Sequence, residues 1–188
     1  MKTFNAFVTE TVEQEILPKN TTVEKILKVA PWLSKAKFTN ATIEIKSNKI
    51  IWKGGTWKGG VWQDGTWENG TWKGGTWNGG TWEHGTWNGG TWENGDWWNG
   101  TWINGIWLYG HWQDGMWYRG TWHSGTWNGG TWKGGTWKGG VWQDGTWENG
   151  TWKKGTWKRG IWKGGTWKGG VWQDGTWKDK KNLRPDKR

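Results

Sequence analysis

Apolar residues follow two different patterns along the chain. In residues 1–50 they recur at helix-like and strand-like spacings, whereas from Ile51 onward the chain repeats every five residues. Tryptophan occupies position 52 and every fifth position up to 177, within 26 consecutive pentads of the form (Thr/Val/Ile)-Trp-x-(Gly/Asn/Asp)-Gly that end near Lys180. A period of five matches neither a helix nor a simple alternating strand, so the pentad itself is the structural unit.

Each pentad reads as a short strand followed by a corner. Thr-Trp-x supplies the β-branched and aromatic residues that suit a pleated surface. The Gly-Gly, Asn-Gly or Asp-Gly pair that follows tolerates the positive φ angles of tight turns. Such a chain coils, and stacked coils pair their backbones in parallel, so residues 51–180 are predicted to form an all-β solenoid. Whole blocks are also copied: residues 51–73 recur at 131–153 with one change, and residues 51–67 recur unchanged at 161–177.

The tryptophans are predicted to line the interior. In an extended chain Gly and Trp, two residues apart, share one face, and the Thr between them takes the other. Outward-facing indoles would create an apolar surface far above the few hundred Å² that a soluble monomer tolerates. The interior would then hold threonine hydroxyls in need of partners. An inward position requires an acceptor for each indole N–H.

This spacing of small, outward, large apolar and two corner residues resembles that of the pentapeptide-repeat proteins, with Gly in place of their Ala and Trp in place of their Leu or Phe. The resemblance covers about 130 of the 188 residues. It implies a right-handed, four-sided parallel β-helix with four pentads per coil and a Trp core. Two pentads per coil is the alternative. Uniform Trp departs from the family pattern, because four indoles per layer need a wider cross-section.

Residues 1–50 are predicted to form a small α+β cap, since an open solenoid end exposes core and unpaired strand edges. Apolar residues at every fourth position predict a helix over residues 2–17, and a second short helix should end at Pro31. Alternating apolar residues over 38–52 predict strands with a turn at Ser47-Asn48.

Positive charge concentrates toward the C-terminal end. The net charge is +10, with +6 in residues 131–180 against −3 in residues 76–130. Residues 181–188 lack apolar periodicity and are predicted to be a disordered basic tail. Clustered cations attract nucleic acid through salt-sensitive contacts. The candidate nucleic-acid-binding residues are Lys153, Lys154, Lys158, Arg159, Lys163 and Lys168.

The repeat chemistry changes in residues 96–119, where apolar side chains replace polar ones outside the Trp column. These residues point outward if the Trp column points inward, and exposed aromatic patches mark interfaces. With four pentads per coil, Tyr118 would stack over Trp98. The alternatives are a local packing adjustment or cover from the N-terminal segment. The candidate partner-binding residues, for a protein partner or self-association, are Trp98, Ile103, Leu108, Tyr109 and Tyr118.

Catalytic and cofactor chemistry finds little support in the sequence. There is no Cys, which excludes disulfides and thiolate metal sites. The three histidines, His84, His111 and His123, occupy three different pentad positions, and no phosphate-binding loop is present. We therefore expect no enzyme activity, metal, cofactor or small-molecule substrate. No apolar run is long enough for a membrane helix, so no membrane association is expected.

The first ten residues, Met-Lys-Thr-Phe-Asn-Ala-Phe-Val-Thr-Glu, resemble the capsid-targeting leader of internal head proteins of large contractile-tailed phages. The resemblance implies cleavage after Glu10, although Val8 and Thr11 depart from the preferred residues around the cut. The predicted function is a non-enzymatic, phage-encoded scaffold, located in the virion or the host cytoplasm. The alternatives are a head-packaged, nucleic-acid-associated protein delivered with the genome, and a fibre or adhesin segment that binds glycans.

Overall fold

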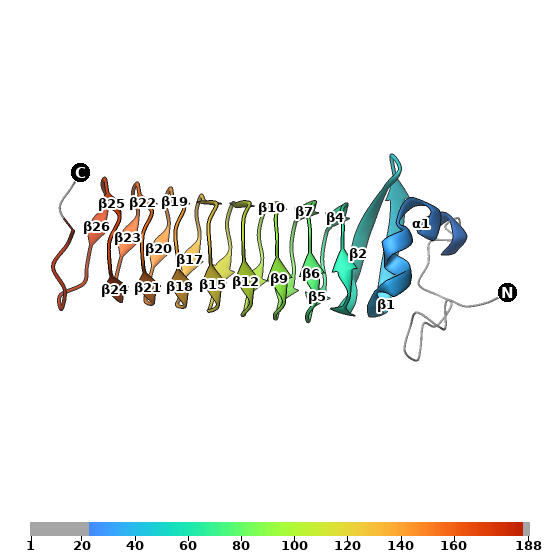
Figure 1. Ribbon diagram of the computed structural model, residues 1–188, viewed down its shortest axis with the longest axis horizontal. Coiled ribbons are helices and arrows are strands. Elements are labelled where there is room, and N and C mark those ends of the chain that lie inside the picture. Colours follow the sequence, from blue (N-terminus) through green and yellow to red (C-terminus); the bar gives the residue numbers. More distant parts are fainter. Residues whose placement is uncertain (1–22, 186–188) are drawn as a thin grey trace.

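The chain forms one elongated parallel β-solenoid with a small cap at its N-terminal end (Figure 1). The computed structural model describes residues 23–185. The expected helix over 2–17 and the expected leader therefore lie outside the described residues. The cap comprises helix α1 (Val23–Val29), the short 3-10 helix η1 (Pro31–Lys35) and strand β1 (Lys37–Lys46), which pairs antiparallel with β2 (Lys49–Gly59).

The strands stack on three faces, and each strand after β2 covers two residues. The first face begins with the Ile51-Trp52 part of β2 and continues with β4 (Thr66–Trp67), β7 (Thr81–Trp82), β10 (Asp96–Trp97), β13 (His111–Trp112), β16 (Thr126–Trp127), β19 (Val141–Trp142), β22 (Thr156–Trp157) and β25 (Val171–Trp172). The second begins with the Thr56-Trp57 part of β2 and continues with β5 (Thr71–Trp72), β8 (Thr86–Trp87), β11 (Thr101–Trp102), β14 (Met116–Trp117), β17 (Thr131–Trp132), β20 (Thr146–Trp147), β23 (Ile161–Trp162) and β26 (Thr176–Trp177). The third comprises β3 (Val61–Trp62), β6 (Thr76–Trp77), β9 (Thr91–Trp92), β12 (Ile106–Trp107), β15 (Thr121–Trp122), β18 (Thr136–Trp137), β21 (Thr151–Trp152) and β24 (Thr166–Trp167).

The pairing register sets the size of the coil. Trp97 pairs in parallel with Trp82 and with Trp112, so one coil consists of three pentads. The prediction of a parallel solenoid is confirmed, but the prediction of four pentads per coil is wrong. Backbone hydrogen bonds continue the ladder on both sides of each strand: Glu83 N–H donates to the Trp67 carbonyl at 2.7 Å, and Thr81 N–H to the Gly65 carbonyl at 2.9 Å.

Three columns of stacked indoles fill the interior, as the sequence predicts for Trp. The Trp97 ring lies parallel to that of Trp82 at 4.8 Å and to that of Trp112 at 4.7 Å between centroids. It meets Trp102 of the next column edge to face, at 6.0 Å and 72°. Both arrangements suit the ring quadrupole. Three mutually tilted indoles complete a layer, which explains why the coil closes after three pentads and not four.

The expectation that each indole N–H finds an acceptor is wrong for most of the core. Among the described residues, 23 buried indole nitrogens have no hydrogen-bond partner, whereas Trp147 Nε1 donates to the Gly164 carbonyl at 3.1 Å. An unpaired buried donor costs about 1–3 kcal/mol. Burial of roughly 150–250 Å² of indole contributes about 4–6 kcal/mol at ~25 cal/mol/Å². Ring burial therefore exceeds the loss at each N–H.

Each corner depends on the glycine that ends the pentad. The backbone φ is positive at every such glycine from Gly55 to Gly175, with 107° at Gly75. A Cβ on Gly75 would also collide with the carbonyl oxygen of Gly60 in the preceding coil. The fourth pentad position does not have a positive φ, so only one residue of the corner pair needs glycine. This explains why the fourth position accepts Asn, Asp, His, Tyr, Arg and Lys.

The N-terminal cap closes the indole columns with aromatic rings of its own. Phe38 stacks on Trp57 at 6.0 Å and meets Trp52 edge to face at 5.4 Å. Trp32 covers Trp62 at 4.9 Å, so the first layer has no open ring face. The predicted helix before Pro31 and the predicted strands are confirmed. Ser47 and Asn48, with φ of 51° and 58°, form the predicted turn in the type I′ manner of tight hairpins.

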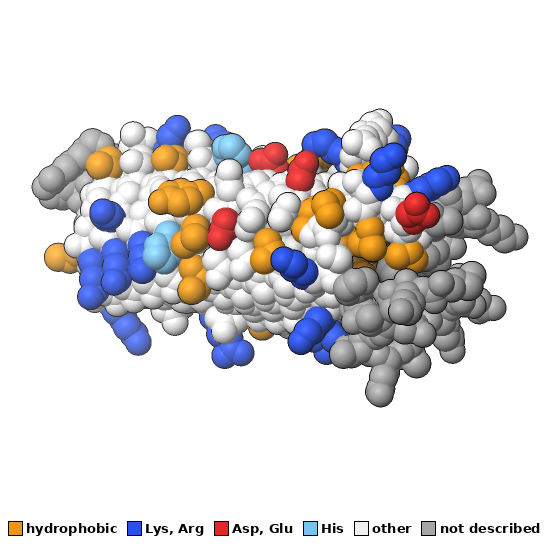
Figure 2. Space-filling model, turned by 45° about the vertical axis from the view of Figure 1, so that its right-hand side comes forward, with side chains coloured by type: hydrophobic (Ala, Val, Ile, Leu, Met, Phe, Trp, Pro, Cys, Tyr) orange, Lys and Arg blue, Asp and Glu red, His pale blue; other side chains and the backbone are white. Residues whose placement is uncertain are grey.

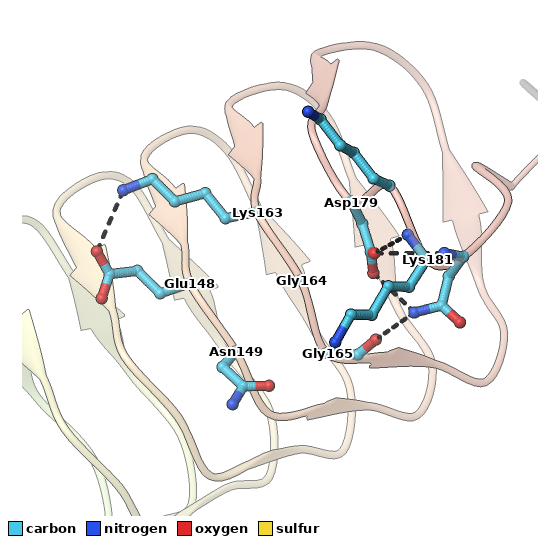
Figure 3. Close-up of a pocket in the computed structure, with 9 residues that line it drawn as sticks. Glu148, Asn149, Lys163, Gly164, Gly165, Asp179 and Lys181 are labelled. Atoms are coloured by element: carbon cyan, nitrogen blue, oxygen red, sulfur yellow. Dashed lines mark hydrogen bonds and ion pairs between the residues drawn. The ribbon is translucent and has the colours of Figure 1, made fainter.

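The C-terminal end is closed by a polar loop instead. Trp177 Nε1 donates to the carbonyl oxygens of Asp179 and Asn182, and Asn182 Nδ2 donates to the Gly165 carbonyl at 3.3 Å. Figure 3 shows this loop beside the last coils. Asn182 belongs to the segment 181–188 whose disorder stays a prediction, and residues 186–188 lie outside the described residues. Trp167 and Trp177 in this last coil are partly exposed.

The difference between the two corner positions predicts opposite effects of neighbouring substitutions. Gly75→Ala should lower the free energy of unfolding by about 3 kcal/mol or more, because it adds a backbone clash to the ~1–3 kcal/mol strain of a left-handed residue. Gly74→Ala is the control, since the nearest atom to its Cβ is 3.9 Å away. It should be neutral or stabilising by up to about 1 kcal/mol. Denaturant unfolding followed by tryptophan fluorescence measures both, and equal destabilisation would contradict the corner assignment.

Candidate functional site

The outer surface is a grid of side chains in which each column repeats once per coil of three pentads. The first and third residues of every pentad point outward on a face, because the Trp between them points inward. The fourth residue stands at the corner that follows. Equivalent side chains three pentads apart therefore lie one above the other, and those one pentad apart lie on neighbouring faces.

Exposed apolar side chains concentrate in two successive coils. Of the seven large hydrophobic residues exposed in the described part of the chain, five lie between positions 98 and 118, with exposed fractions of 52% for Trp98, 42% for Ile106, 60% for Tyr109, 41% for Met116 and 38% for Tyr118. Ile103 and Leu108 in the same coils are half-buried. We name these seven residues the apolar belt. Five of them are candidates that the sequence predicted, whereas Ile106 and Met116 were not predicted; they occupy the first pentad position and also face outward.

The belt runs round the solenoid and does not occupy one face. Trp98 stands on the first face, whereas Tyr118 follows β14 on the second face. Tyr118 stacks over Ile103, because Met116 pairs with Thr101. The predicted stacking of Tyr118 over Trp98 is therefore wrong, since it assumed four pentads per coil. The Lys133 ammonium lies 4.8 Å from the centre of the Tyr118 ring, a cation–π contact.

The described part of the cap does not cover the belt. Trp32 and Phe38 contact Trp52, Trp57 and Trp62, which lie in the first coil. The belt begins at Trp98, three coils further on. Within residues 23–185 its outermost side chains therefore remain exposed.

The six basic residues predicted to bind nucleic acid divide among all three faces. Lys153, Lys154 and Lys168 belong to the third face, and Lys163 belongs to the second. Two of these six side chains already form ion pairs. Arg159 pairs with Asp144 at 2.9 Å, and Lys163 pairs with Glu148 at 3.2 Å. Lys158 lies on the first face beside Arg159. The predicted set does not form one surface.

The third face instead collects a row of uncompensated lysines. Lys138, Lys153 and Lys168 follow β18, β21 and β24 and stand in one column, since Thr136 pairs with Thr151 and Thr151 with Thr166. Within the part of the chain that the structure describes, these lysines form no ion pair, and neither does Lys154 beside them. Figure 2 shows a row of basic side chains near the C-terminal end that meets a histidine. We name Lys138, Lys153, Lys154 and Lys168 the lysine ladder.

Sequence reasoning missed Lys138 because it grouped charges by segment. The spacing of three pentads between Lys138, Lys153 and Lys168 can be seen in the sequence. It places the three lysines in one column only because a coil consists of three pentads. The Lys154 side chain lies over Gly139 of the preceding coil, with carbons 3.7 Å from the place of a Cβ there.

His123 continues the lysine column toward the belt. The Lys138 ammonium lies 3.2 Å from His123 Nε2, which can accept its hydrogen bond when the imidazole is neutral. Burial and the Lys138 charge both lower the pKa of His123. The imidazole is therefore neutral at pH 7, and the positive charge of the row resides on its lysines.

The described histidines and carboxylates outside the lysine ladder form local contacts. His111 contacts Asp96 at 3.0 Å on the exposed first face. Within residues 23–185, no three His, Cys, Asp or Glu side chains come close enough to hold a metal ion. A pocket near the C-terminal loop (Figure 3) contains Glu148, which pairs with Lys163, and Asp179, whose pKa is lowered by hydrogen bonds from Asn182 and Lys181. Glu148 is therefore engaged between two coils of the second face, and Asp179 is engaged in the loop that closes the last coil.

Helices are few in the described structure, and none of those present has the length and apolar character needed to cross a bilayer. No protein-family model matches the chain, and no curated protein matches it. The fold places it among parallel β-solenoids with short, regular coils.

The contact between Lys138 and His123 predicts a measurable change in pKa. Lys138→Gln should raise the pKa of His123 toward 6.5 without fully restoring it, because burial remains. NMR titration of the imidazole carbon-bound protons measures this, with His84 and His111 as internal references. Since the folded-state pKa is depressed, the unfolded chain binds more protons, and His123 should reduce stability as the pH falls through about 6.5. An unchanged or lower pKa in the variant would contradict the assigned cause.

Proposed function

We propose that this protein is a non-enzymatic scaffold that docks another protein through the apolar belt. The observation that supports the proposal is the concentration of exposed Trp, Tyr, Ile and Met side chains in two coils of an otherwise polar surface. Exposed apolar groups at such density mark interaction sites. Trp and Tyr are also the residues that most often dominate binding energy at interfaces.

The rigidity of the solenoid favours this role. The backbone N–H of every belt residue donates to a carbonyl of the preceding coil, as where Tyr118 N–H donates to the Trp102 carbonyl at 2.8 Å. A preorganised surface loses little conformational entropy when it binds. Because the belt extends over all three faces, a partner that covers it must wrap round the solenoid or bind in more than one copy.

We also propose that the protein has no catalytic activity. A catalytic site needs a base, an orienting group and a pocket that hold a substrate together. Most close pairs among the described titratable groups connect successive coils of one face, such as Lys53 with Glu68 at 2.6 Å, where both side chains are half-buried. Such pairs stabilise the ladder, and this includes Glu148 with Lys163, which line the pocket near the C-terminal loop.

Substitution of the three large aromatic belt residues tests the docking role. Trp98→Ser, Tyr109→Ser and Tyr118→Ser together should abolish partner binding, while the unfolding free energy changes by less than about 0.5 kcal/mol per site. The matched control carries Gln143→Ser, Asn94→Ser and Lys73→Ser, which occupy the same pentad positions on the same three faces.

Cross-linking mass spectrometry in producing cells identifies the partner, and sedimentation velocity of the purified protein detects self-association. We expect the wild type and the control to retain a stoichiometric protein partner, or a second copy, that the belt variant loses. Equal association of all three proteins would overturn the belt assignment. A monomer with no cross-linked partner would do the same.

We further propose that the protein is phage-encoded and that residues 1–10 act as a capsid-targeting leader. The support is the opening Met-Lys-Thr-Phe with Phe7 and the Val8-Thr9-Glu10 sequence. Mass spectrometry of purified virions should find a chain that begins at Thr11. A virion protein that begins at Met1 would exclude the leader. Absence from virions, with the protein in the infected-cell cytoplasm, would exclude head packaging.

A further inference from the structure

The third face carries an unbroken field of positive charge near the C-terminal end. Its outward residues over positions 106–170 include the four lysines of the ladder and His123, and they include no Asp or Glu. The remaining outward side chains of these columns are neutral. The field therefore has no internal counter-charge on its own face.

On the other faces, several cations pair with a carboxylate in the same column. Lys53 pairs with Glu68, Arg159 with Asp144 and Lys163 with Glu148, each pair one coil apart. Like charges opposite one another on neighbouring strands are destabilising. The lysine ladder places three like charges in successive coils, which is unfavourable unless an anion occupies the face.

The length of the row favours a polymeric anion. The indoles beneath the ladder, Trp137, Trp152 and Trp167, are spaced by 4.8 and 5.0 Å, so the three lysines rise from the face at the same short intervals. Thr136, Thr151 and Thr166 run beside them in the first pentad position and offer hydroxyl donors. Lysines and hydroxyls are the groups that hold a phosphate backbone in register.

An aromatic platform stands at one end of this row. Leu108 lies in the column of the lysines and His123, and Tyr109 lies in the column of Lys154. Tyr109 is 60% exposed, so its side chain is accessible to a partner. Proteins that bind single strands combine a basic track for phosphates with aromatic rings on which bases stack. Duplex recognition instead inserts a helix or ribbon into a groove, and this flat face offers no such element.

We propose that the third face binds single-stranded nucleic acid, with phosphates along the lysine ladder and a base on Tyr109. This site is separate from the protein-docking surface formed by the apolar belt, and the two surfaces share only Tyr109 and its neighbours.

Duplicated blocks explain the origin of the site: Lys138 and Lys168 are copies of Lys58, and Lys153 is a copy of Lys73. The copies are displaced by 16 and 22 pentads, neither a multiple of three, which moves them from the second face to the third.

Charge reversal on two faces tests the location of the site. Fluorescence anisotropy with a labelled oligothymidine 12-mer at low salt should show binding by the full chain. Lys153→Glu with Lys168→Glu should weaken it more than ten-fold and lower the salt slope by about 0.7 for each phosphate that is no longer bound. Lys58→Glu with Lys73→Glu is the matched control, with the same pentad position and the same change in net charge on the second face. It should retain affinity within about three-fold.

Further variants separate this proposal from the docking role. Tyr109→Ser should weaken binding about ten-fold, in line with ~1–3 kcal/mol for stacking of one base. Trp98→Ser with Tyr118→Ser, which alters the belt on the other two faces, should leave the affinity for the oligonucleotide unchanged. Thermal unfolding confirms that each variant folds.

Three results would overturn the proposal. The first is no binding of the 12-mer at low salt. The second is equal weakening by both charge-reversal pairs, which would indicate an effect of net charge alone. The third is equal affinity for heparin or duplex DNA together with no effect of Tyr109→Ser, which would indicate a general polyanion surface.

Discussion

The parallel stacking of indole rings is the interaction on which the rest of this structure depends. Rings in one column are separated by 4.7–4.8 Å around Trp97, and this spacing equals the distance between neighbouring strands of a β-sheet. Ring contact and backbone hydrogen bonding therefore favour the same rise per coil. The rings also meet edge to face between columns, which sets three of them in a layer and determines the number of pentads per coil.

This constraint explains how few other requirements the repeat has. The Trp must point inward and the last residue of the pentad must be glycine, because its φ is positive and the preceding coil leaves no room for a Cβ, as at Gly75. The first, third and fourth positions face solvent or corners, so they can change without disturbing the core. That freedom lets one scaffold carry the apolar belt around residues 98–118 and the lysine ladder on the third face.

The three-pentad coil also turns duplication into a means of building surfaces. A block copied by a multiple of three pentads returns to its original face, whereas any other displacement moves it to another. The copies of Lys58 and Lys73 arrive in this way on the third face, where carboxylates are missing from positions 106–170. On the first face, Asp144 and Arg159 arrive one coil apart and pair. In this fold, therefore, the residue that compensates a charge lies one coil away in the same column and not beside it in the sequence.

The sequence by itself determined that the pentad is the unit, that Trp lies inside, that a helix and a hairpin precede the solenoid, and that residues such as Trp98 and Tyr109 face outward. These follow from local spacing, because side-chain alternation and turn chemistry act over a few residues. Only the tertiary structure decided that three pentads close a coil, because this depends on how indoles pack across the lumen. Every long-range neighbour follows from that number. Tyr118 therefore lies over Ile103 and not Trp98, and Lys138 joins Lys153 and Lys168 in one column.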